Sequence, residues 1–141
     1  MDIALSTTLH TGFDRAVDAV REALAEQGFG ILTDIDMAAT IKAKLGHDME
    51  DYRILGACNP PLAHQAVGIN RQIGLLLPCN VVVRRDPHDT ELIHVEAMNP
   101  ELMVEVTSDA RLRPVAADAA ARLAAALETL DRHAGPGPSQ R

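Results

Sequence analysis

The junction at Asn59 and Pro60 constrains the fold of this chain more strongly than any other feature. The segment 52–58 before it is apolar and has the composition of a buried strand. Asparagine is a favoured N-cap, and proline suits the first helical position because its missing N–H group would be unpaired there anyway. The junction therefore predicts a strand followed at once by a helix, with Cys58 directly before the helix N-terminus.

Four further segments have the composition of strands. They are 3–9, 30–35, 80–84 and 91–96. The last two flank the turn-rich stretch 86–90, so we expect them to pair as an antiparallel hairpin.

Cap and stop residues predict where the helices begin and end. Thr11, with Asp14 three residues later, is expected to cap the first helix, which Gly28 stops. Asp36 can cap a short second helix. The helix that starts at Pro60 is expected to continue until just before Gly74.

An alanine-rich segment, 114–130, predicts a long last helix whose apolar residues form one stripe. Such a stripe needs a sheet to cover. The order of elements therefore predicts an α+β fold, a two-layer sandwich with a mainly antiparallel sheet and helices on one face. We expect a single domain over residues 1–132 and a flexible tail over 133–141, where glycine and proline are frequent.

Charge and composition exclude several classes of partner. The chain has 20 acidic against 13 basic residues and a net charge of −7, which repels phosphate backbones. One tyrosine and two phenylalanines are too few for a base-stacking surface. The longest apolar run, 73–77, is far shorter than the roughly 20 residues that span a bilayer. We expect neither a nucleic acid nor a membrane partner.

The start of the chain has no basic segment followed by a long apolar run, so no secretory signal peptide is expected. Two cysteines without an export signal are expected to stay reduced, as in the cytoplasm. No glycine-rich phosphate loop is present. The sequence therefore predicts a cytoplasmic protein and identifies no cofactor.

Three segments carry a resemblance to a known family. They read FGILTDID at 29–36, ILGACNP at 54–60 and GLLLPCNVV at 74–82. Over about residues 1–130 the chain resembles the family called domain of unknown function 302. Its paired Ala-Cys-Asn-Pro and Leu-Pro-Cys-Asn signatures make a chance match improbable.

The resemblance implies a compact sheet-and-helix domain, similar to a single copy of the TATA-binding-protein-like fold and often a homodimer. It implies no established activity, although some members of the family are fused to or encoded near sulfur-handling or redox proteins. Cys58, Asn59 and Pro60 match the first signature, and Pro78, Cys79 and Asn80 match the second. Asp34 and Asp36 match the acidic stretch.

The two cysteines are the main candidates for chemistry. A helix N-terminus stabilises a thiolate, so the pKa of Cys58 is expected to be lowered. Cys79 follows a proline at a chain reversal, and the sheet order can bring both thiols to the same end of the domain. The competing interpretation is that both cysteines are small buried apolar residues beneath the helix.

A soft-metal site is a weaker hypothesis. Cys58, Cys79, His64 and His94 offer four soft ligands. A structural zinc site normally takes a pair of ligands from a tight C-x₂₋₄-C or H-x₃₋₅-H motif, and this sequence has neither. Met103 is an additional sulfur, but methionine at helical spacing is more typical of core packing.

Acid–base catalysis by Asp34 and Asp36 is also conceivable, because the two carboxylates point the same way on a strand end. Aspartate at a strand-to-helix step more often caps the next helix, and we favour that interpretation for this pair.

Two functional hypotheses follow. The first is a non-enzymatic, homodimeric domain that binds or senses a small ligand, metal or sulfur species near Cys58 and Cys79, with Asn59, Asn80 and Asp34 at the same site. The alternative is a thiol-dependent enzyme or thiol carrier in which Cys58 is the nucleophile and Cys79 the resolving thiol.

Overall fold

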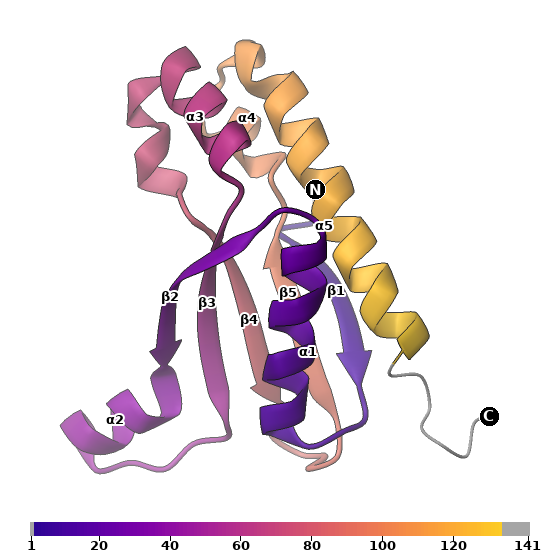
Figure 1. Ribbon diagram of the computed structural model, residues 1–141. Helices are drawn as coiled ribbons and strands as arrows, with labels where there is room; N and C mark the ends of the chain where they lie inside the picture. The colour runs from indigo at the N-terminus through magenta and orange to yellow at the C-terminus, as the bar shows by residue number, and fades with distance from the viewer. Residues whose placement is uncertain (1, 134–141) are drawn as a thin grey trace.

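The computed structural model describes residues 2–133 and contains one five-stranded sheet with helices packed on it (Figure 1). Every neighbouring pair of strands is antiparallel. The strand order is β1-β5-β4-β3-β2, so β1 and β2 form the two edges. The predicted α+β class is confirmed. The strands are β1 (Ala4–Leu9), β2 (Gly30–Asp36), β3 (Tyr52–Cys58), β4 (Cys79–Arg85) and β5 (Ile93–Met98).

Apart from α2, which lies at the opposite end of the sheet from α3 and α4, the helices fall into two groups (Figure 1). In the first group, α1 lies across one face of the sheet beside the C-terminal half of the long last helix, α5. The second group, α3 and α4 with the start of α5, lies beyond one end of the sheet. The α-helices are α1 (Phe13–Glu26), α2 (Met37–Leu45), α3 (Pro60–Ile69), α4 (Leu102–Thr107) and α5 (Arg113–His133), with 3₁₀ turns η1 (Arg71–Leu76) and η2 (Ala110–Leu112).

The main core lies between the sheet and the pair α1 and α5. Alternate residues of the strands point into it, as the two-residue period of a strand requires. Its most deeply buried members include Val20 of α1, Leu55 of β3, Val81 and Val83 of β4, Ile93 and Val95 of β5, and Leu123 of α5.

A second core lies beyond the end of the sheet, under α3, η1, α4 and the first turns of α5. Its buried members are Leu62, Ala66, Ile73, Met103, Leu112, Val115, Ala116 and Ala119. Helix α5 joins the two cores, because Val115 and Ala119 belong to the second core and Leu123 and Leu127 to the first. The seam between the cores is where the candidate site lies.

Most predicted boundaries are confirmed. Asp36 caps α2 by accepting a hydrogen bond from the Ala39 N–H group at 2.9 Å, and Gly46 ends this helix with a φ of 72°. Asn59 caps α3 by accepting from the Leu62 N–H group at 3.3 Å. The predicted hairpin is β4 and β5.

Two boundary predictions are wrong. The N-cap of α1 is Gly12 and no side chain caps this helix, so Thr11 does not form the predicted capping box. The first helical hydrogen bond runs from the Ala16 N–H group to the Gly12 carbonyl, so Thr11 lies one residue before the N-cap position. Helix α3 ends at Ile69, because the side chain of Asn70 accepts from the Gln72 N–H group and begins η1.

Helix α5 continues to His133, and the remainder of the predicted tail, 134–141, lies outside the described residues. Between residues 2 and 133, no helix is long and apolar enough to cross a membrane.

Candidate functional site

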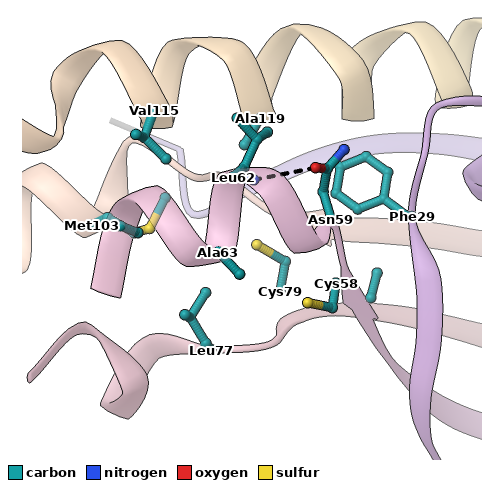
Figure 2. A pocket seen from close by; sticks show the side chains of 12 residues that line it. Phe29, Cys58, Asn59, Leu62, Ala63, Leu77, Cys79, Met103, Val115 and Ala119 are labelled. Carbon is teal, nitrogen blue, oxygen red and sulfur yellow. Dashed lines mark hydrogen bonds between the residues drawn. The ribbon is translucent and has the colours of Figure 1, made fainter. Parts of the chain in front are cut away.

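A small pocket lies at the seam between the two cores, and we call it the seam pocket (Figure 2). The end of β3 and the start of β4 form one side, and α3, α4 and α5 form the others. It is lined by Phe29, Ala57, Cys58, Asn59, Leu62, Ala63, Ala66, Leu77, Cys79, Met103, Val115 and Ala119.

Asn59 has a structural role at the rim of this pocket. Its side-chain oxygen accepts from the Leu62 N–H group, drawn as the dashed line in Figure 2, and its amide nitrogen donates to the Gln27 carbonyl at 3.4 Å. Only 8% of Asn59 is exposed. Gly28 has a φ of 86°, and a Cβ there would lie 3.1 Å from the Asn59 amide nitrogen. The Asn59 carboxamide therefore ties the start of α3 to the end of α1.

Cys79 is a buried thiol with a strongly shifted pKa. It is 5% exposed, and it lies opposite Ala57 in the β3–β4 ladder. Burial raises the pKa of Cys79 to about 11, with a smaller contribution from the negative charge of an ionised Cys58. At neutral pH this thiol is protonated and a poor nucleophile.

Cys58 ends β3 and is half-buried, so it is the more accessible of the two thiols. Both cysteines are free. They line the same pocket, but Cys79 lies opposite Ala57 and not opposite Cys58 in the ladder, and the thiol pair expected from the sequence is not shown.

The pocket is small and uncharged. The space left for a water-sized molecule is about 20 Å³, which is room for about one water. None of the lining residues is Asp, Glu, Lys, Arg or His. Three of them carry sulfur, namely Cys58, Cys79 and Met103, and Met103 is also a core residue, as its spacing predicted. The walls therefore favour an uncharged, polarisable group over an ionic one.

Two of the predicted ligand-binding residues lie elsewhere. Asn80 is exposed and points to the opposite face of the sheet from Cys79, because successive side chains of a strand alternate between faces. Asp34 lies on the edge strand β2 and forms ion pairs with Arg21 and Arg53. Hydrogen bonds from Arg53, and then from Arg21, lower the pKa of Asp34 against the opposing effect of burial.

The four proposed metal ligands are not assembled. His64 is exposed on α3, and the Nε2 atom of His94 lies 2.8 Å from Asp86 Oδ1. In the described part of the chain, no three His, Cys, Asp or Glu side chains gather closely enough to hold a metal ion. The hydrogen bond from His94 is the main reason that the pKa of Asp86 is lowered.

Sequence reasoning missed the wall that α5 contributes through Val115 and Ala119. A signal was available in the lengths of the elements. A helix of 21 residues extends roughly 32 Å, whereas a strand of seven residues extends roughly 23 Å. The long helix must therefore overhang the sheet and cover something else at one end.

Comparison with known proteins adds a family and a fold. Residues 5–130 match the family model described as domain of unknown function DUF302. The chain is similar to an uncharacterised conserved DUF302 protein from Bacillus stearothermophilus, whose crystal structure it matches with a TM-score of 0.82 and 28% identity. That match covers 91% of this chain and 98% of the other. No curated protein matches the chain.

Proposed function

The chain belongs to the DUF302 family, whose name assigns no activity, and we propose that it is a non-enzymatic domain that binds or senses a small ligand in the seam pocket. One observation supports this proposal most. The half-buried thiol of Cys58 lines a cavity whose walls are almost entirely apolar. Small-molecule sites typically combine apolar walls with a few polar groups of this kind.

The ligand in this proposal is uncharged and polarisable, such as a small sulfur compound. A charged ligand would lose its hydration without gaining an ionic partner, because no ionic side chain lines the pocket. The thiols of Cys58 and Cys79 and the thioether of Met103 provide soft contacts. Asn59 contributes from the rim. Asn80 and Asp34 have no part in this version of the site.

The present cavity holds about one water, so a larger ligand requires its walls to move. Leu77 is the wall residue best placed to do so. It is half-buried, and it lies between the 3₁₀ turn η1 and β4, outside any helix or strand. Ligand entry in this scheme displaces Leu77 and leaves the sheet in place.

The test is an NMR titration with two probes that differ mainly in charge. Dimethyl sulfide is uncharged, and trimethylsulfonium carries a positive charge on the same atom. We expect saturable shifts of the Cys58, Leu62 and Ala63 amides with dimethyl sulfide and none with trimethylsulfonium. Equal responses to the two probes would contradict an uncharged site.

Two alanine-to-leucine variants locate the binding. Ala63 lines the pocket, so Ala63→Leu should fill it and abolish the response to dimethyl sulfide. Ala121 is exposed on α5, and Ala121→Leu should bind as the wild type does. Binding that survives in Ala63→Leu would place the ligand elsewhere.

The alternative function is a thiol enzyme or carrier with Cys58 as nucleophile and Cys79 as resolving thiol. The raised pKa of Cys79 weighs against it, because only roughly 10⁻⁴ of this thiol is ionised at neutral pH. Alkylation rates of Cys58→Ser and Cys79→Ser against pH separate the two functions. Fast labelling of Cys58 near neutral pH, followed by oxidation to a Cys58–Cys79 disulfide without unfolding, would favour the enzyme.

We also propose that the protein is a homodimer that pairs through β2 and α2, which we call the β2–α2 arm. No residue of α2 is buried. On the arm, Leu32 is 65% exposed and Leu45 63% exposed, and β2 is an edge strand. Exposed apolar residues beside a free strand edge are typical of a surface that another chain covers.

Sedimentation of charged variants tests the dimer. Leu32→Asp with Leu45→Glu should convert a dimer into a monomer. Leu75→Glu is the matched control, because Leu75 is 83% exposed in η1, outside the arm. A monomeric wild type would refute the proposal.

The free state of both cysteines also supports a reducing location, and we propose the cytoplasm.

A further inference from the structure

A second cavity lies between α4 and the start of α5, and we call it the α4–α5 groove. It has a volume of about 290 Å³, near the lower end of the range for small-molecule sites, roughly 300 Å³. It shares no lining residue with the seam pocket. Its walls are Glu101, Val104, Glu105, Arg113, Ala116 and Ala117.

Three charged side chains line this groove, and they do not pair with one another. In the described residues 2–133, the side chains of Glu101, Glu105 and Arg113 make no ion pair or hydrogen bond. By contrast, Arg111, two residues earlier, holds both oxygens of Asp109, at 2.9 and 2.6 Å. The groove therefore offers two free carboxylates and one free guanidinium around one hollow.

The backbone that carries these charges is firmly anchored. Met103 on α4 is 2% exposed, and Leu112, directly before Arg113, is completely buried. Pro100, directly before Glu101, is also fully buried. The backbone of the groove therefore keeps its geometry before a ligand arrives, whereas the charged side chains of Glu101, Glu105 and Arg113 are exposed.

Arg113 stands where its own helix does not favour a cation. It is the first residue of α5, and the positive end of the helix macrodipole lies there. The Arg113 N–H group already donates to the Ala110 carbonyl in η2, so a carboxylate bound beside Arg113 would be stabilised mainly by the guanidinium. Residues that break a local rule without an internal partner often mark functional sites.

We infer that the α4–α5 groove binds a diamino carboxylic acid, a molecule with one carboxylate and two ammonium groups. Its carboxylate pairs with Arg113, and its ammonium groups pair with Glu101 and Glu105. Its aliphatic chain lies over Val104 and Ala116. The charges of this ligand are opposite to those of the groove. A ligand without a carboxylate leaves Arg113 unpaired, and one with fewer ammonium groups leaves a glutamate unpaired.

The test is an NMR titration of the full chain with three related probes. Lysine carries all three charges, norleucine lacks the side-chain ammonium, and cadaverine lacks the carboxylate. We expect lysine to bind in the millimolar range, because solvent-exposed ion pairs are individually weak. Norleucine and cadaverine should each bind about two- to fivefold more weakly, and added salt should weaken all three.

Charge-removing variants assign the binding to the groove. Glu105→Gln and Arg113→Gln should each weaken lysine binding about two- to fivefold, and the double variant by more. Arg71→Gln is the matched control, because Arg71 is exposed in η1 and does not line the groove. Absence of saturable binding, equal affinity for the three probes, or unchanged affinity in the double variant would each overturn the inference.

Discussion

The buried thiol of Cys79 predicts a loss of stability at alkaline pH. Burial raises its pKa from 9.0 to about 11 in the folded chain. Between these two values the unfolded chain has released the thiol proton while the folded chain still holds it. The folded state then binds more protons than the unfolded state, so the free energy of unfolding falls as pH rises.

The size of this effect follows from the pKa difference of about two, which corresponds to about 3 kcal/mol. The stabilisation is fully present below about pH 9 and is lost as the pH rises towards about 11. For a domain of ordinary stability, about 5–15 kcal/mol, that loss is a large fraction of the total.

The assay is urea unfolding in reducing buffer at a series of pH values between about 8 and 11. Cys79→Val removes the titrating thiol and keeps the side chain apolar, with one additional carbon atom. All other ionisable groups are common to the two proteins, so their effects cancel in the difference. We expect the wild type to lose about 2 kcal/mol more than Cys79→Val across this range, because half of the folded-state thiol is still protonated at about pH 11.

Cys58→Ser is the control for this prediction. It keeps the burial of Cys79, which is the larger cause of the raised pKa, so most of the alkaline loss should persist. Stability curves of wild type and Cys79→Val that run parallel from neutral to alkaline pH would refute the reasoning.

Three further predictions concern stability. Gly56→Ala should cost about 1–3 kcal/mol in chemical unfolding, because its Cβ would overlap Thr33, whereas Gly68→Ala has open space and should be tolerated. Asn59→Ala should cost about 1–2 kcal/mol in the same assay by removing the α3 cap, and Asn59→Asp should retain most of that stability. Asp34→Asn should cost about 1 kcal/mol at neutral pH. Because the folded-state pKa of Asp34 is lowered, its contribution is present above pH 3.8 and fades as the pH falls through the folded value, so variant and wild type should converge in acid.

Local chemistry made much of the fold predictable. The end of β3 and the start of α3 depend on Asn59 and Pro60 alone, and the Asp36 cap of α2 depends on one side chain. The start of α1 was not predictable in this way. There the backbone bond from Ala16 to Gly12 places the helix start one residue after Thr11, and no side chain caps it.

The candidate site was predictable only in part. Cys58, Asn59 and Cys79 line the seam pocket, as the family signatures suggested, but Asn80 does not. Neighbours along a strand face opposite ways, so the two-residue period already separated Asn80 from Cys79. The wall from α5 depends on a contact between distant parts of the chain, which sequence spacing alone does not specify.

Intermolecular NOEs from dimethyl sulfide are the most direct test of ligand binding in the seam pocket. Binding in the seam pocket predicts NOEs from the probe's methyl protons to the methyl groups of Leu62, Ala63 and Leu77, and their loss in Ala63→Leu. NOEs only to exposed apolar residues such as Leu32 or Leu75, or none at a saturating probe concentration, would contradict it.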